Sequence, residues 1–277
     1  MKKKIIIAIA IILVVVVDLF VLLYPTVSDY INSSSQSRVV AQYFDDVSDM
    51  DNSNMQLLLQ SAHEYNKRLL TKQDRFLFTD AETAEYQGLL NSSRGVMGIL
   101  VIDRIAVKLP IYHGTDAGVL QVGLGHLQGS SLPVGGTGTH SIITGHRGLP
   151  SSTLLTDLNQ MAKDDVFVLY VMGETLTYQV DQILIVDPYE VEALGINPDT
   201  DYCTLVTCTP YGVNSHRLLV RGRRIDNAEN AGWNSVYADA KILDTVRIIL
   251  IFIIPVLLAL LVFIIIKIRK IRKGGIV

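Results

Sequence analysis

Apolar and polar residues alternate in short runs over the second half of the chain, which is the pattern of β-strands. The runs are rich in Val, Ile, Leu, Thr and Tyr, and Gly, Pro, Asp and Asn separate them. We predict strands over 98–102, 107–112, 140–144, 166–171, 175–186, 202–208 and 217–224, with a hairpin turn at 172–174. Seven or eight strands within about 130 residues predict a closed or nearly closed barrel.

Helical spacing is confined to two places. Over 55–70 the apolar residues Leu58, Ala62, Tyr65 and Leu69 follow a helical period, which predicts an amphipathic helix packed on the domain. Residues 152–161 begin with a serine cap and predict a short helix. The polar stretch 25–55 is predicted to be a stalk with one short helix around 37–44, and 71–94 has no periodicity and is predicted to be a loop.

Two long apolar runs flank this middle part. Residues 5–23, interrupted only by Asp18, and residues 248–266 are each long enough to cross a bilayer. A cleaved signal peptide is the alternative for the first run, but the run is long for one and no small-x-small cleavage site follows. Basic residues flank the outer end of both runs, so the positive-inside rule predicts two cytoplasmic termini and an extracellular middle.

Composition narrows the functional classes. The 277 residues carry a formal net charge of −3 and are 49% hydrophobic, which suits one globular domain with membrane segments. The basic residues gather at the two ends, so no nucleic-acid partner is expected. The six histidines show no H-E-x-x-H or C-x-x-C spacing, and we expect neither a metal site nor a cofactor.

The sequence around Cys208 suggests a reactive thiol. Cys208 ends an apolar run and precedes a turn, whereas most cysteines in such runs are small core residues. A hairpin would return Arg217 towards it, and nearby positive charge favours the reactive thiolate. Cys203 lies five residues earlier and would face the other side of the strand, so we expect it to pack in the core without forming a disulfide.

A second stretch supplies a histidine. His146 follows the apolar run 140–144 in a Gly-His-Arg-Gly-Leu-Pro loop, and Cys208, His146 and Arg217 form a plausible nucleophile, acid/base and oxyanion donor. His216 neighbours Arg217 and must point the other way, and residue patterns alone do not choose between them. Rivals for the arginine are Arg147 and Arg221; His126 and His140 suit structural roles, and His63 a surface position.

Several motifs in register resemble those of class C sortases, the pilin-polymerising transpeptidases of Gram-positive bacteria. They are TLVTCTPYGVNSHRLLVRG (204–222), TGHRGLP (144–150), GHLQGSSLPVGG (125–136) and LPIYHGT (109–115), and the resemblance covers roughly residues 60 to 225. It implies an eight-stranded sortase barrel with Cys208, His146 and Arg217 as catalytic residues. It also implies a lid anchored by an Asp-Pro-aromatic motif, for which Asp74 and Phe76 are the nearest match, with Arg75 in place of the proline.

The resemblance implies a reaction. Cys208 would cleave an LPxTG-like sorting signal between Thr and Gly, and the acyl group would pass to a lysine amine of another pilin subunit. Attachment of surface proteins to cell-wall peptidoglycan, a cysteine protease, and a non-catalytic membrane-tethered assembly factor remain as alternatives. The expected partners are pilins or other surface proteins with such signals.

The predicted fold class is mainly β with short helices, an N-terminal helical and lid region and two flanking transmembrane helices. The chain is predicted to have six parts. The parts are an N-terminal anchor (1–24), an extracellular helical stalk and lid (25–94), the catalytic barrel (95–226), a linker (227–245), a transmembrane helix (246–266) and a basic cytoplasmic tail (267–277).

Overall fold

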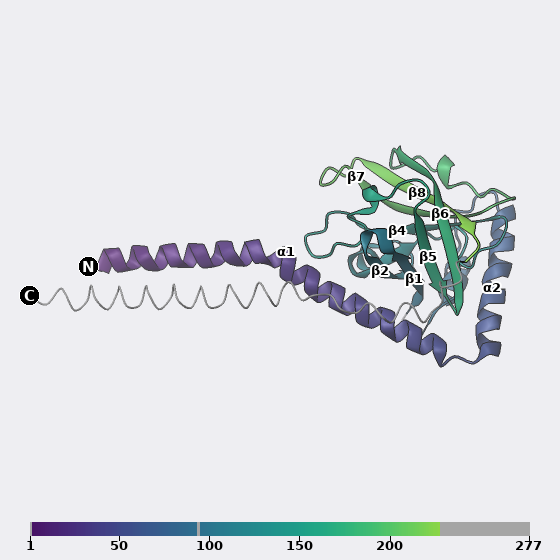
Figure 1. The fold of residues 1–277 in the computed structure, drawn as a ribbon, viewed down its shortest axis with the longest axis horizontal. Helices are drawn as coiled ribbons and strands as arrows, with labels where there is room; N and C mark the ends of the chain where they lie inside the picture. The colour runs from purple at the N-terminus through teal and green to yellow at the C-terminus, as the bar shows by residue number, and fades with distance from the viewer. Residues whose placement is uncertain (1, 93–94, 228–277) are drawn as a thin grey trace, which may run out of the picture. The chain divides into compact units, whose positions relative to one another are not determined.

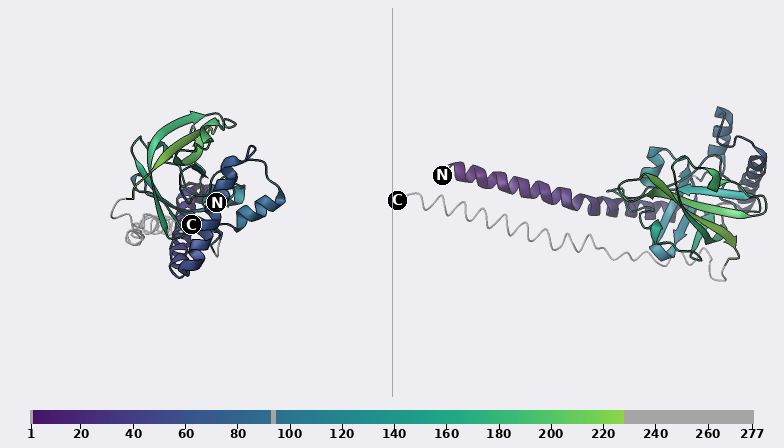
Figure 2. Two further views of the ribbon diagram at one scale, coloured as in Figure 1. Left: turned by 90° about the vertical axis from the view of Figure 1, so that its right-hand side faces the viewer. Right: turned by 90° about the horizontal axis from the view of Figure 1, so that it is seen from above.

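The computed structural model describes residues 2–92 and 95–227, without the side chains of 2–13, 15, 16 and 19. Its main feature is a closed barrel with the strand order β1-β2-β3-β4-β7-β8-β6-β5, whose strands curve around a common interior (Figures 1 and 2). The strands are β1 (Val96–Ile102), β2 (Val107–His113), β3 (Leu124–His126), β4 (Thr139–Thr144), β5 (Val166–Val171), β6 (Glu174–Val186), β7 (Asp201–Thr209) and β8 (His216–Ile225).

The seven strands predicted from alternation are confirmed, and so is the hairpin turn. Met172 and Gly173 join β5 to β6 with positive φ angles of 43° and 84°, as a tight hairpin requires. The eighth strand, β3, was not predicted, because its three residues are too short to show an alternating pattern. β3 pairs in parallel with β2 and antiparallel with β4, and it thereby closes the sheet between them.

The helices differ more from the sequence prediction. α2 (Asn52–Thr71) confirms the amphipathic helix, but α1 (Lys2–Ser48) is one continuous helix where a stalk with a short helix was expected. α3 (Asp80–Gly88) lies inside the expected loop, where Thr79 and Glu82 cap it reciprocally. The expected helix over 152–161 is wrong: Leu154 has a φ of 38°, and only η2 (Leu158–Gln160) forms there. The remaining elements are α4 (Ala117–Val122), η1 (Asp103–Ile105) and η3 (Glu192–Leu194).

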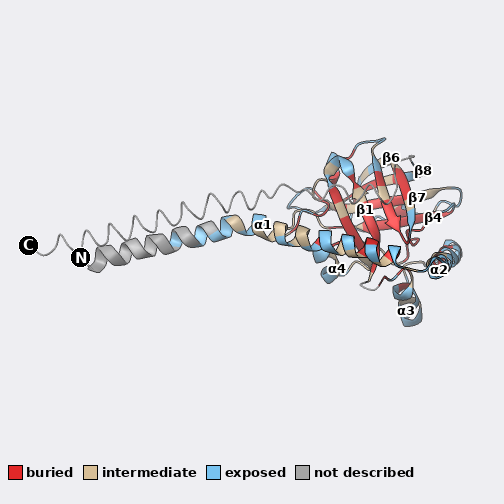
Figure 3. Ribbon diagram, turned by 60° about the horizontal axis from the view of Figure 1, so that its bottom comes forward, coloured by how far each residue is buried: buried red, intermediate tan, exposed pale blue. Residues whose placement is uncertain are grey.

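The interior of the barrel continues into a layer made by helices. Among the described residues, the contacts divide the chain into two units, residues 2–30 and residues 31–227. Within the larger unit the last turns of α1 bury Val40, Tyr43, Phe44 and Val47 in the same cluster as the barrel interior. Figure 3 shows the buried residues concentrated in the strands and on one side of these turns. Burial of this apolar surface stabilises the unit.

One of the two predicted membrane spans lies within the described residues, and the other does not. A search of the described residues finds no helix that combines the length and the apolarity needed to cross a bilayer. The first predicted span, 5–23, lies within α1 and is therefore not confirmed. The second predicted span, together with the linker and the basic tail, lies outside the described residues.

Tyr43 joins α1 to strand β1 and to the turn between β5 and β6, and its hydroxyl gives a test of this packing. Its Oη donates to the carbonyl of Met97 at 3.2 Å and accepts from the amide of Met172 at 2.9 Å. We expect Tyr43→Phe to destabilise the protein by about 1–3 kcal/mol, because it leaves two buried backbone groups without partners. Urea unfolding of the full-length chain measures this, with Tyr189→Phe as control because Tyr189 is 94% exposed. Equal stability of the two variants would contradict the assigned role of Tyr43.

Candidate active site

The thiol of Cys208 and the guanidinium of Arg217 come from directly opposed residues of neighbouring strands. β7 and β8 are antiparallel, and their register pairs Cys208 with Arg217 and Thr209 with His216. Side chains of directly opposed residues project from the same face of a sheet, with Cβ atoms about 5 Å apart. The two groups therefore share one face and one end of the sheet, whereas His216 faces the other way.

His146 reaches the same end of the sheet from the opposite side of β7. β4 and β7 are parallel, and their register pairs Thr144 with Val206. The alignment continues past the end of β4, since the amide of Gly145 donates to Val206 O at 3.1 Å and Thr207 Oγ1 donates to Gly145 O at 2.8 Å. One further step along both chains brings His146 level with Cys208. The three predicted residues thus lie at one end of three adjacent strands: His146 just after β4, Cys208 near the end of β7 and Arg217 near the start of β8.

Close packing keeps the backbone before His146 next to β7. A Cβ on Gly145 would stand 2.6 Å from Leu124 Cδ2 and 2.9 Å from Leu155 Cδ1, so any larger residue would have to displace these two buried leucines. The carbonyl of His146 accepts from the amide of Leu155 at 3.2 Å, which fixes the first turn of the loop. His146 is partly exposed, so its ring can meet both Cys208 and a ligand.

The two cysteines occupy opposite faces of β7, as predicted. Cys203 is fully buried in the barrel interior, and Cys208 is partly exposed on the outer face; both are free thiols. Burial raises the pKa of the Cys203 thiol well above its usual value, with a further contribution from Asp201, so Cys203 stays protonated and unreactive. Cys208 is the thiol that a ligand can reach.

The geometry separates Arg217 from its two rivals. Nη1 of Arg217 donates to the carbonyls of Asn214 and His216 at 3.2 and 3.1 Å, and within the described residues Nε and Nη2 have no partner. Arg221 is held by Asp181 at 2.8 and 3.0 Å and lies over the ring of Tyr202. Arg147 donates to Thr209 Oγ1 at 3.2 Å. Of the three, only Arg217 combines the register of Cys208 with donors left for a ligand.

Comparisons with known proteins identify the family of this chain. A Sortase domain model matches residues 100–225. Sortase C1 of Streptococcus agalactiae is 48% identical, with a TM-score of 0.66 over 69% of this chain and 100% of that structure. Sortase C of Streptococcus pneumoniae is 42% identical, with a TM-score of 0.63 over 69% and 97%. The chain belongs to the sortase family, and within it to class C.

This chain matches less than two thirds of the length of a more distant relative. Sortase D of Bacillus subtilis is 29% identical over 131 residues, which is 46% of this chain and 63% of that protein. The family and the enzyme class predicted from the motifs are thereby confirmed. The comparisons do not test the individual roles of Cys208, His146 and Arg217, so these remain predictions that the register described above supports.

Two histidines of this sortase, His126 and His140, have structural roles, as the sequence predicted. His126 Nε2 donates to Ser131 O at 2.9 Å while Nδ1 faces the hydroxyl of Tyr86 at 2.9 Å. His140 Nδ1 donates to Gly195 O and Nε2 accepts from Thr204 Oγ1, both at 2.7 Å. Burial lowers the pKa of each imidazole to about 4.

The predicted lid residues lie in the α2–α3 connection, and their role stays a prediction. The Asp74 side chain is exposed. Arg217 donates to the carbonyls of Asn214 and His216. Phe76 is partly buried, and its ring lies 4.8 Å from the guanidinium carbon of Arg75. Sequence reasoning missed Arg75, which reaches the β6–β7 connection by donating to Leu194 O at 2.6 Å.

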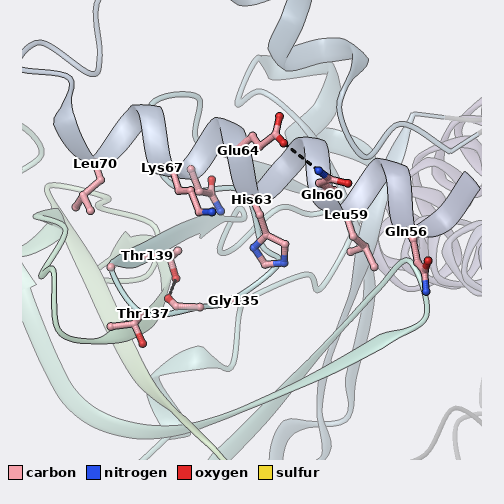
Figure 4. Close-up of a pocket in the computed structure, with 13 residues that line it drawn as sticks. Gln56, Leu59, Gln60, His63, Glu64, Lys67, Leu70, Gly135, Thr137 and Thr139 are labelled. Atoms are coloured by element: carbon pink, nitrogen blue, oxygen red, sulfur yellow. Dashed lines mark hydrogen bonds between the residues drawn. The ribbon is translucent and has the colours of Figure 1, made fainter. Parts of the chain in front are cut away.

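One hollow of the described part lies away from the predicted site. It has a volume of about 550 Å³ and lies between α2, with His63 and Lys67, and the segment 135–139 (Figure 4). Thr139, at its edge, begins β4, whereas His146 follows the end of that strand, about 20 Å further along at 3.3 Å per residue. Within residues 2–92 and 95–227, no group of three or more His, Cys, Asp or Glu is arranged to hold a metal ion.

The low pKa values of His126 and His140 predict how stability depends on pH. Between pH 6.5 and about 4 the unfolded chain binds protons that the folded sortase excludes, so stability falls as the pH falls through this window. Each histidine contributes a slope of about 1.4 kcal/mol per pH unit. We expect His140→Gln to reduce the slope by that amount and the control His63→Gln, on an exposed position, to leave it unchanged. Urea unfolding at several pH values measures the slope, and an unaltered slope in His140→Gln would contradict the assignment.

Proposed function

We propose that this sortase is a membrane-anchored cysteine transpeptidase that joins pilin subunits. The observation that carries the proposal is the register that sets Cys208 opposite Arg217, with His146 level with them across β7. The class C relationship supports pilins as substrates, and the solved structure from Streptococcus pneumoniae is described in terms of pilin substrate specificity. The apolar runs and their basic flanks support two membrane anchors, cytoplasmic termini and an extracellular barrel.

The first half of the reaction forms a thioester. The sulfur of Cys208 attacks the carbonyl carbon of the threonine in an LPxTG-like signal, and the carbonyl oxygen takes the negative charge. Arg217 donates hydrogen bonds to this oxygen through the N–H groups that the described residues leave unpaired. His146 gives a proton to the nitrogen of the departing glycine, the C–N bond breaks, and the acyl group remains on Cys208.

The second half transfers the acyl group. A lysine amine of another subunit loses its proton to His146 and attacks the thioester carbon. Arg217 again binds the oxyanion, the C–S bond breaks, and an isopeptide bond joins the two subunits. Water competes with the amine, so the reaction benefits from a site that a bound peptide closes to solvent.

Replacing the two cysteines separately tests the nucleophile. We expect Cys208→Ala of the full-length chain to form no thioester with a sorting-signal peptide and no pilin polymer. Cys203→Ala should keep both activities, because Cys203 is buried in the interior. Intact-mass spectrometry detects the acyl adduct, and gel electrophoresis detects a ladder of high-mass pilin. Polymer growth by Cys208→Ala would exclude the proposal. If the unmodified chain gave single wall-anchored proteins in place of a ladder, wall attachment would be favoured.

The role of Arg217 is tested by how far its replacement changes kcat and KM. We expect Arg217→Ala to lower kcat about 10²–10³-fold, because removal of one oxyanion donor in other enzymes has that effect, while KM changes much less. Arg221→Ala is the matched control, since Arg221 lies four residues along the same strand and is paired with Asp181. Steady-state kinetics with a sorting-signal peptide and an amine acceptor measure both constants. An equal loss of kcat in the two variants would contradict the role of Arg217.

A further inference from the structure

The second half of β6 has a neighbouring strand on one side only. β5 pairs with residues 174–179 of β6, and Val180 then exchanges backbone hydrogen bonds with Asp164 and Asp165 at 2.9 and 2.8 Å. Residues 182–186 pair with β8, and no other strand of the described part of the chain pairs with them. Alternate residues of an antiparallel strand direct their N–H and C=O groups to the same side, so this free edge offers backbone donors and acceptors.

The free edge carries exposed apolar side chains. Ile183 and Ile185 project from the same face of β6 and are 38% and 64% exposed. The edges of sheets in soluble proteins are usually protected by charged residues or proline, whereas residues 182–186 read Gln-Ile-Leu-Ile-Val and contain neither. An unprotected edge with an apolar face is a surface to which an extended peptide can add as a further strand.

The chain that follows the free edge is acidic. The β6–β7 connection begins with Asp187, Glu190 and Glu192, and all three residues are exposed. Within the described residues no lysine or arginine forms an ion pair with them, and His216 Nε2 lies 3.6 Å from Oδ1 of Asp187. Carboxylates without a lysine or arginine partner favour a positively charged ligand. We call residues 182–186, together with these three acidic residues, the edge surface.

The free edge ends level with the predicted catalytic residues. Val186 of β6 pairs with Arg217 of β8, and Arg217 pairs in turn with Cys208 of β7. A strand added to β6 would lie three strand spacings from β7, which is about 14 Å, a distance that about four extended residues cover. A segment bound at the edge can therefore present a lysine, a few residues further along, to an acyl group on Cys208.

We propose that the edge surface binds the acceptor subunit through an extended segment next to its reactive lysine. The acceptor is the occupant that fits, because the amine substrate is positively charged. The Leu, Pro, Thr and Gly of a sorting signal carry no charge, and the signal must lie at Cys208. Apolar residues of the acceptor segment would contact Ile183 and Ile185. The inference rests on the proposed function, since it concerns the second substrate of that reaction.

Reversing two charges of the edge surface tests its role in the second half of the reaction. The acceptor is a purified pilin whose own sorting signal has been removed. We expect Glu190→Lys/Glu192→Lys in the full-length chain to raise KM for this pilin about tenfold, because the surface then repels a cationic segment. Transfer to hydroxylamine, which is too small to use the surface, should keep its rate, and so should thioester formation with a sorting-signal peptide. Steady-state kinetics in mild detergent and intact-mass spectrometry measure these reactions.

Glu174→Lys/Asp199→Lys is the matched control. Both residues are exposed, and the double variant changes the net charge by the same amount. Glu174 begins β6 and Asp199 lies two residues before β7 begins, so both lie at the end of the sheet away from Cys208. We expect the KM of this variant for pilin to equal that of the unmodified chain. An unchanged KM in Glu190→Lys/Glu192→Lys, or an equal rise in the control, would overturn the inference.

The apolar part of the edge surface is tested separately. We expect Ile185→Ser to raise KM for pilin about fivefold, because the bound segment loses an apolar contact, and to leave transfer to hydroxylamine unchanged. Leu57→Ser is the control, since Leu57 of α2 has a similar exposure of 60% and lies outside the edge surface. The same KM in the two variants would contradict strand addition at β6.

The measurements separate a failure of this inference from a failure of the proposed function. If the edge variants weaken thioester formation with the sorting-signal peptide as much as transfer to pilin, the edge surface binds the sorting signal and the inference is wrong. If the unmodified chain forms no thioester, the proposed function fails and the inference falls with it. Normal thioester formation, with no effect of the edge variants on transfer to pilin, would overturn the inference alone.

Discussion

The pairing of β7 with β8 is the constraint on which the predicted site depends. Their register sets Cys208 opposite Arg217, and a shift of one residue would send one side chain to the other face. Arg217 is held further by two carbonyls of its own turn. β4 adds His146 from the other side, because parallel strands end at the same edge of the sheet. Residues from three separate stretches of the sequence are thus brought to the same end of the sheet.

The two faces of β7 make different contributions to this arrangement. The interior, with Cys203 and Leu205 of β7, fixes the strands by burying apolar surface on one face. A smaller apolar cluster uses the opposite face of the same strands, and its buried members are Ile142, Val186, Leu194 and Leu219. The β6–β7 connection, which supplies Leu194, is held there by hydrogen bonds to the adjacent carbonyls of Leu194 and Gly195.

Much of this architecture follows from the sequence, for reasons that the structure makes clear. Alternation predicts a strand wherever one face is buried, so seven strands and the opposite faces of Cys203 and Cys208 were predictable. β3 was missed because three residues carry no period. α3 was missed because its residues are mostly polar and show no apolar period. Thr79 and Glu82 form a capping box, which is a local signal for the start of this helix. The contact of Arg75 with Leu194 joins residues 119 positions apart, and no local pattern predicts it.

A crystal structure of the sortase with a sorting-signal peptide ketone bound covalently to Cys208 tests the central claim most directly. The ketone carbon takes the place of the threonine carbonyl carbon, and its oxygen stands for the oxyanion. The account predicts that this oxygen lies about 2.7–3.1 Å from a guanidinium nitrogen of Arg217. It also predicts that the imidazole of His146 lies next to the position that the departing glycine nitrogen would occupy. An oxygen that points away from Arg217, or a His146 ring out of reach of the bound peptide, would contradict it.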